Sequence, residues 1–125
     1  MIKILILDDE HIIRQSLSDY FEDQDWQTVE ADSAEAAFAL LKQQKFSAAI
    51  VDIRLPGIDG NEFIRLSAPR HPRMGFLICT GSPDFIIPPD LHVFANVSSW
   101  LCKKPLRDLG ELKQELVLLM SNLKI

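Results

Sequence analysis

Cysteine is scarce in this sequence, because only Cys79 and Cys102 occur among its 125 residues. Two cysteines at this separation give neither the ligand spacing of a zinc site nor a CxxC redox pair. Both lie in apolar segments, so the sequence predicts buried, reduced thiols.

Long apolar runs are also lacking, and none approaches the ~18 residues that a membrane-spanning helix needs. The amino-terminal stretch leads into the acidic run 8–10 and has neither the apolar core nor the small-residue cleavage site of a signal peptide. We therefore expect a cytoplasmic protein that has no membrane partner.

Basic residues are also fewer than acidic ones. Thirteen Lys and Arg residues stand against eighteen Asp and Glu residues, which gives a net charge of −5. Binding to a nucleic-acid backbone needs a basic face, and the densest basic stretch, 65–73, is broken by Pro69 and Pro72. We interpret this stretch as a solvated loop and expect no direct contact with nucleic acid. No G-x-G-x-x-G pattern follows the first apolar run, which excludes a dinucleotide-binding protein.

The composition that is present, 47% hydrophobic and 25% charged, is typical of a globular domain, and we assign 1–125 to one domain. Short apolar runs rich in β-branched residues predict five strands, at 2–7, 26–31, 46–51, 76–79 and 100–102. Strands that alternate with helices along one domain indicate a parallel α/β sheet with right-handed crossovers.

Helical periodicity fills the gaps between these strands. Apolar positions predict helices over 13–21, 61–66 and 109–123. Asp32 and Glu35 form a capping box that predicts another helix starting there. Three prolines between 83 and 89 prevent a regular helix in that stretch, which leaves room for a short helix at about 91–95.

Chemically active side chains stand at the ends of the predicted strands. Asp8 and Asp9 follow the first strand and Asp52 the third, while Thr80 and Lys104 follow the last two. The carboxyl ends of the strands form the ligand-binding edge of such a sheet. Clustered carboxylates repel one another unless a cation joins them, and Mg²⁺ prefers oxygen ligands of this kind. A metal ion beside a lysine suits phosphoryl transfer, in which an Asp carboxylate can be the nucleophile.

Together these segments resemble the receiver domain of bacterial two-component response regulators, over essentially the whole chain. Segment 4–10 is similar to the family's first strand and acidic pair, and segment 52–60 to its phosphoacceptor segment, Asp followed by Leu-Pro and then Asp-Gly. Thr80-Gly81 matches the switch hydroxyl, and Lys104-Pro105 matches the final lysine with its usually cis proline. The resemblance implies a flavodoxin-like, doubly wound, five-stranded parallel sheet in the order 2-1-3-4-5, with helices on both faces.

The resemblance also implies the roles of three site residues. Asp52 would accept a phosphoryl group from a histidine kinase or a histidine phosphotransfer protein. Lys104 would pair with the phosphoryl oxygens, and Thr80 would move toward them. An added phosphoryl charge must recruit nearby donors, which is consistent with a mobile Thr80 loop.

A Mg²⁺ site is implied by the same resemblance. Asp9 and Asp52 would bind the ion directly and Asp8 through water, with the backbone carbonyl of Arg54 completing the protein's ligands.

The chain departs from the family pattern before its final lysine. The family usually has an aromatic residue three positions before that lysine, but this chain has Leu101 there, and its aromatic residue, Trp100, comes one position earlier. Either a bulge shifts the strand, or the ring has lost its usual role. The prolines imply a fourth helix that is irregular or shortened. We place Trp100, Leu101, Phe85 and Phe94 on the switch and partner face. Two interpretations stay open: core packing under a long loop, or an altered docking surface for a partner or a homodimer.

The leading functional interpretation is a phosphoacceptor switch that catalyses only its own phosphorylation and dephosphorylation, and not an enzyme with an outside substrate. It would act on an unidentified output partner or domain, either as a single-domain regulator or as the N-terminal receiver of a longer protein. One alternative is a pseudo-receiver, an interaction module that works without phosphorylation. Another is a Mg²⁺-dependent phosphatase, but such enzymes typically carry Asp-x-Asp at the first strand, whereas the acids here are adjacent.

Overall fold

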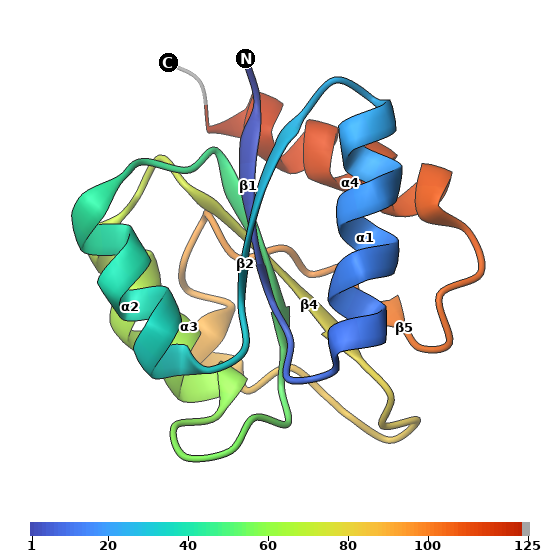
Figure 1. Cartoon of the computed structure of the whole chain (residues 1–125). Helices are drawn as coiled ribbons and strands as arrows, with labels where there is room; N and C mark the ends of the chain where they lie inside the picture. The colour runs from blue at the N-terminus through green and yellow to red at the C-terminus, as the bar shows by residue number, and fades with distance from the viewer. Residues whose placement is uncertain (124–125) are drawn as a thin grey trace.

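A five-stranded parallel sheet forms the centre of the molecule (Figure 1). The computed structural model describes residues 1–123. Its strands pair in the order β2-β1-β3-β4-β5, as the resemblance implied. Their bounds are β1 (Lys3–Leu7), β2 (Gln27–Ala31), β3 (Ala48–Asp52), β4 (Gly75–Thr80) and β5 (Cys102–Lys103).

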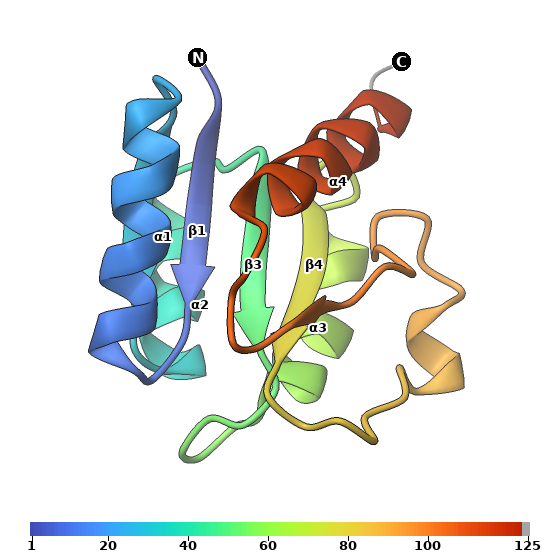
Figure 2. The same cartoon turned by 90° about the vertical axis from the view of Figure 1, so that its right-hand side faces the viewer.

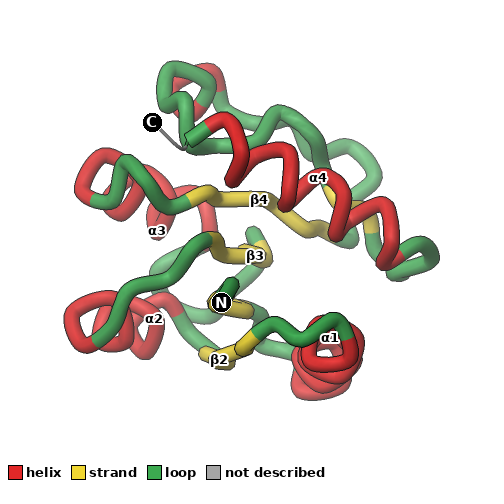
Figure 3. The backbone as a smooth tube through the Cα atoms, turned by 90° about the horizontal axis from the view of Figure 1, so that it is seen from above, coloured by secondary structure: helices red, strands yellow, loops and turns green. Residues whose placement is uncertain are grey.

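Helices cover both faces of the sheet, so the predicted doubly wound architecture is confirmed. Helices α1 (His11–Asp23) and α4 (Leu109–Asn122) lie on one face, and α2 (Ala34–Gln43) and α3 (Gly60–Ser67) lie on the other. Figure 3 shows the resulting three layers from above. Among residues 1–123, no helix is long and apolar enough to cross a membrane.

The side chains of β1 show how the sheet builds a core on each face. Ile4 and Ile6 belong to the cluster that includes residues of α1 and α4, whereas Leu5 and Leu7 belong to the cluster that includes residues of α2 and α3. All four side chains are fully buried. Successive strand residues point to opposite faces, and a central parallel strand is covered on both, which explains the unbroken apolar run.

The helix predicted after Asp32 is confirmed but its predicted N-cap is wrong, and the helix expected at 91–95 is wrong. Helix α2 starts at Ala34, and its N-cap is Ser33, whose hydroxyl accepts a hydrogen bond from the Ala36 amide at 3.1 Å. The N-cap is therefore Ser33 rather than Asp32, and no reciprocal capping box forms, because the residue three positions after Ser33 is Ala36. The expected helix at 91–95 is replaced by a 3-10 turn, Pro89–Leu91, because the amides that follow bond to carbonyls three residues back as separate turns. The fourth helix of the family pattern is thus shortened to this turn (Figure 2).

The edge strand is interrupted, and the predicted strand at 100–102 is wrong in its start, because β5 begins at Cys102. Val97 forms an isolated bridge to Phe76 at the start of β4, and Cys102 pairs with Cys79 near its end. The edge segment advances five residues between these contacts while β4 advances three. Two extra residues are therefore accommodated as a bulge, and Trp100 lies before the strand rather than in it.

The side chains that we placed on the partner face are partly buried. Trp100 packs against the α1 and α4 core, whereas Leu101, Phe85 and Phe94 pack against the α2 and α3 core. Ile86, by contrast, is 81% exposed. Core packing thus accounts for much of this apolar segment, and the role of these residues in partner binding stays a prediction.

Candidate functional site

The sheet topology brings the predicted site residues to one edge. Asp8 follows β1, Asp52 ends β3, Thr80 ends β4, and Lys104 follows β5. Because all five strands are parallel, these carboxyl ends lie on the same side of the sheet. Asp9 lies beside Asp8 but is exposed, whereas Asp8 is buried.

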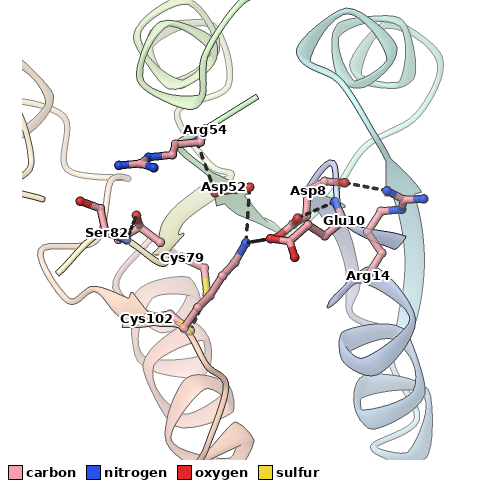
Figure 4. A network of polar contacts seen from close by, with 10 residues as sticks. Asp8, Glu10, Arg14, Asp52, Arg54, Cys79, Ser82 and Cys102 are labelled. Carbon is pink, nitrogen blue, oxygen red and sulfur yellow. Dashed lines mark hydrogen bonds and ion pairs between the residues drawn. The ribbon is translucent and has the colours of Figure 1, made fainter. Parts of the chain in front are cut away.

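Carboxylates crowd together at this edge. Oxygen atoms of Asp8, Asp9, Glu10 and Asp52 all lie within 4.8 Å of one another. The ammonium of Lys104 lies among them, with Nζ 2.7 Å from Asp8 Oδ2 and 3.4 Å from Asp52 Oδ2. Figure 4 shows Asp8, Glu10 and Asp52 converging from two neighbouring strand ends.

Burial and neighbouring charges together set the protonation of the site. Asp52 is 5% exposed, and its burial, together with the charge of Asp8, raises its pKa to about 6 against the opposing effect of Lys104. Burial by itself would lower the pKa of Lys104, but the hydrogen bond to Asp8 and the charges of the acids outweigh it and raise that pKa. Lys104 is therefore a permanent cation, and Asp52 is a carboxylate with unusually high proton affinity.

Backbone amides hold the two buried acids in place. The Glu10 amide donates to Asp8 Oδ1 at 2.9 Å, and the Arg54 amide donates to Asp52 Oδ1 at 3.3 Å. The chain after Asp52 then folds back so closely that a Cβ on Gly60 would lie 2.1 Å from the Asp52 carbonyl oxygen. Glycine at position 60, the last residue of the phosphoacceptor segment, is thus required by sterics.

Thr80 lies at the carboxyl end of β4, one residue beyond the partner of Asp52 in the β3–β4 register. Its side chain is buried, and Oγ1 accepts a hydrogen bond from the Ser82 amide at 3.1 Å. The hydroxyl proton is free to turn toward another acceptor. The expected cis bond between Lys104 and Pro105 is present, and the predicted burial of both thiols is confirmed.

Sequence reasoning missed two residues of this network. Glu10 Oε1 lies 3.4 Å from Lys104 Nζ, and its place directly after the acidic pair was the available signal. Arg14 donates from Nη1 to the Asp8 carbonyl at 2.8 Å (Figure 4). Its Nε pairs with Glu30 of β2. Nothing in the sequence pattern indicated this pairing, because it depends on α1 packing beside β2.

The donor set of the cluster suits a hard divalent cation. Its ligand atoms are carboxylate oxygens, the type that Mg²⁺ prefers, and Mg²⁺ usually uses only a few of them and keeps its remaining positions for water or phosphate. Neither thiol belongs to this cluster of candidate ligands. The residues present therefore fit Mg²⁺, and the same edge offers a nucleophilic carboxylate beside a lysine.

Comparison with known proteins identifies relatives of this chain. A family model described as the response regulator receiver domain matches residues 4–87, a range that ends before Lys104. Response regulator protein FleR of Pseudomonas aeruginosa is 36% identical over 78 residues, which is 62% of this chain and 16% of FleR. Sporulation initiation phosphotransferase F of Bacillus subtilis is 32% identical over 63 residues, 50% of this chain and 51% of that protein.

The chain thus spans about half or less of the length of these curated relatives. Among solved structures, it is similar to response regulator protein TrrA of Thermotoga maritima, with a TM-score of 0.82 and 23% identity over 95% of this chain and 99% of that one. TrrA was crystallised in complex with Mg²⁺ and BeF. At this level of identity the likeness establishes the fold alone.

Proposed function

Because the chain belongs to the response regulator receiver domain family, we propose that it is a phosphoacceptor signalling switch whose acceptor is Asp52. The observation that carries the proposal is a buried Asp52 carboxylate grouped with three other acids and 3.4 Å from Lys104 Nζ. The phosphoryl donor is a phosphohistidine of a histidine kinase or a histidine phosphotransfer protein. As the oxygen of Asp52 bonds to phosphorus, the phosphorus–nitrogen bond of the donor breaks.

The carboxylate of Asp52 is oriented by its neighbours. The Arg54 amide donates to Oδ1, and Oδ2 is the oxygen that faces Lys104. On phosphorylation, Lys104 exchanges its contact with Asp8 for the new phosphoryl oxygens, because these carry more negative charge than one carboxylate.

Mg²⁺ fits the acid cluster, with Asp8, Asp9 and Asp52 as the side chains that would hold it and the Arg54 carbonyl as a further ligand. When bound, it supplies positive charge that neutralises the oxygens of the transferred group.

Thr80 is the residue that would report the phosphoryl group. Its hydroxyl proton can turn toward a phosphoryl oxygen while Oγ1 keeps or releases the Ser82 amide. Movement of this turn would pass to the segment 82–99 and from there to an output partner. We propose that the protein acts on no outside substrate and catalyses only its own phosphorylation and dephosphorylation.

The test is incubation with acetyl phosphate in the presence and absence of Mg²⁺, followed by intact mass measurement after a cold acid quench. We expect one phosphoryl adduct that requires Mg²⁺ and disappears in Asp52→Asn. Asp59→Asn is the matched control, because Asp59 is an exposed acid seven residues along the same segment that caps α3, and Asn preserves the cap. Its adduct should equal that of the wild type.

Two results would contradict the proposal. An adduct that persists in Asp52→Asn would mean that another residue is the acceptor. No adduct from a folded protein that binds Mg²⁺ would favour the pseudo-receiver alternative.

A further inference from the structure

The two cysteines of the chain lie side by side although 23 residues separate them. Cys79 of β4 and Cys102 of β5 are register partners on neighbouring parallel strands. Their Sγ atoms are 2.7 Å apart, and the side chains are only 1% and 4% exposed. Figure 4 shows them meeting just below the acid network. The proposed phosphoryl chemistry uses neither thiol.

We propose that Cys79 and Cys102 are a redox modification site that forms a reversible intramolecular disulfide. Neighbouring strands lie roughly 4.8 Å apart, and disulfide-bonded Cα atoms are typically about 4.4–6.8 Å apart, so paired positions on β4 and β5 satisfy the backbone requirement. Both side chains belong to the same core cluster and therefore point to the same face of the sheet. A bond of about 2.05 Å between the sulfurs requires an approach of only roughly 0.7 Å.

A small oxidant has a route to this pair. A cavity of about 400 Å³ is lined by Cys102 and by residues of the β5–α4 connection, including Pro105 and Leu106. Cys79 does not line it, so Cys102 is the thiol that is reached first. The hydrogen bond donated by Cys79, together with the charge of Lys104, outweighs burial and lowers the pKa of Cys102, while the same contact and burial raise the pKa of Cys79. Cys102 is therefore the thiol of the pair that reaches the thiolate form first.

Hydrogen peroxide is the oxidant class that fits the cavity. The Cys102 thiolate attacks one peroxide oxygen, the oxygen–oxygen bond breaks, and a sulfenic acid and hydroxide result. Cys79 then attacks the Cys102 sulfur, forms the disulfide and expels the sulfenic oxygen, and the two thiol protons end in water. Two thiols and one peroxide thus give one disulfide and two waters, and a small thiol reductant restores the pair by exchange.

A metal site is a poorer explanation of the pair. A structural zinc ion takes four ligands, and the group of candidate metal ligands found among residues 1–123 contains acids and neither cysteine. Two thiols alone do not complete such a site.

The disulfide would act on a segment that has little regular secondary structure. It would close the segment 80–101, in which a 3-10 turn replaces the helix expected from the family pattern. Thr80 directly follows Cys79, and Lys104 comes two residues after Cys102. Oxidation would therefore fasten together the strand ends that carry both residues.

The test begins with the wild-type protein treated with hydrogen peroxide and then alkylated with N-ethylmaleimide. We expect an intact mass lower by two hydrogens, no alkylation at either cysteine, and a Cys79–Cys102 cross-linked peptide that a thiol reductant removes. Hydrogen–deuterium exchange of the oxidised protein should then slow over 80–101 relative to the reduced protein. These readouts do not depend on phosphorylation, so their failure is separate from failure of the proposed function.

Controls make the outcome decisive. Cys79→Ser, with folding checked by circular dichroism, should give Cys102 sulfenic or sulfinic acid without loss of two hydrogens. The inference is overturned if both wild-type thiols remain alkylatable, if Cys102 becomes sulfinic acid while Cys79 stays free, or if the disulfide forms only in urea-denatured protein.

Discussion

The ammonium of Lys104 lies closer to one acid of the site than to the others. Its Nζ lies 2.7 Å from Asp8 but 3.4 Å from both Asp52 and Glu10. The Asp52 carboxylate is therefore buried beside Asp8 with incomplete compensation, which agrees with its raised pKa of about 6. An added cation near Asp52 would stabilise the folded protein, because the negative charge of Asp52 destabilises it.

The first prediction is that Asp52→Asn stabilises the protein at pH 7 in EDTA. The folded pKa lies above the ordinary value of 3.8, so between about pH 4 and 6 the folded state binds more protons than the unfolded state, and wild-type stability falls as the pH rises. Asn carries no such charge. The variant should therefore be more stable at pH 7 by up to about 3 kcal/mol, measured by urea unfolding.

The pH profile discriminates this explanation from a general effect of mutation. The stability advantage of Asp52→Asn should shrink toward zero below about pH 4, where Asp52 of the wild type is mostly protonated in both the folded and the unfolded state. A gain of equal size at every pH, or a less stable variant at pH 7, would contradict the raised pKa.

A second prediction concerns competition between Lys104 and a divalent cation. Lys104→Met removes the ammonium from among the carboxylates, so Mg²⁺ should bind about tenfold more tightly, equivalent to ~1.4 kcal/mol of relieved repulsion. Isothermal titration calorimetry measures the affinity. Lys103→Met is the control, because Lys103 is exposed one residue away, and it should leave the affinity nearly unchanged. Unchanged or weaker binding to Lys104→Met would show that the two cations do not share a site.

Among the strands, those that are buried on both faces could be predicted from the sequence. The central strands β1, β3 and β4 were recognisable because burial on both faces demands continuous apolar runs. The two-residue strand β5 starts later than predicted, because its position depends on pairing with β4. The bulge that precedes it has no signal in the local sequence.

The same limit applied to the site. Strand ends located Asp8, Asp52 and Lys104, because parallel topology fixes where those ends meet. Glu10 and Arg14 were missed because the direction of a side chain after a strand, or on a helix facing a neighbouring strand, follows from tertiary packing. The pairing of the two cysteines was missed for the same reason.

The approach of α3 to β3 provides a third prediction. A methyl group on Gly60 would collide with the backbone of Asp52 at 2.1 Å, so Gly60→Ala must displace either the helix start or the acceptor strand. We expect a loss of about 3 kcal/mol or more in unfolding free energy, measured by urea denaturation. Gly81→Ala is the control, since the nearest atom to its added Cβ would be 3.8 Å away. Equal stability of both variants would contradict the steric requirement.

For the whole molecule, the parallel topology gathers its polar chemistry at one edge while the two cores occupy the faces. The described fold therefore joins an acid cluster to a five-stranded sheet and to one connection, 82–99, that contains little regular secondary structure. FleR and sporulation initiation phosphotransferase F both extend beyond the part that matches this chain.

A fourth prediction is that Mg²⁺ stabilises the entire fold through this edge. At a free concentration one hundred times its dissociation constant, Mg²⁺ should add about 2.7 kcal/mol to the unfolding free energy of the wild type. Asp52→Asn should gain less, because it loses one ligand. Urea unfolding in NaCl of equal ionic strength controls for screening. The same gain in both proteins would place the ion elsewhere.

The measurement that tests the central claim most directly is the identity of the phosphorylated residue. After reaction with acetyl phosphate and Mg²⁺, borohydride reduces an aspartyl phosphate to homoserine, which peptide mass spectrometry locates. We predict homoserine at position 52, dependent on Mg²⁺, with Asp8 and Asp9 intact. A reduction product at Asp8 or Asp9, or unmodified Asp52 in a protein that carries the phosphoryl adduct, would contradict the account.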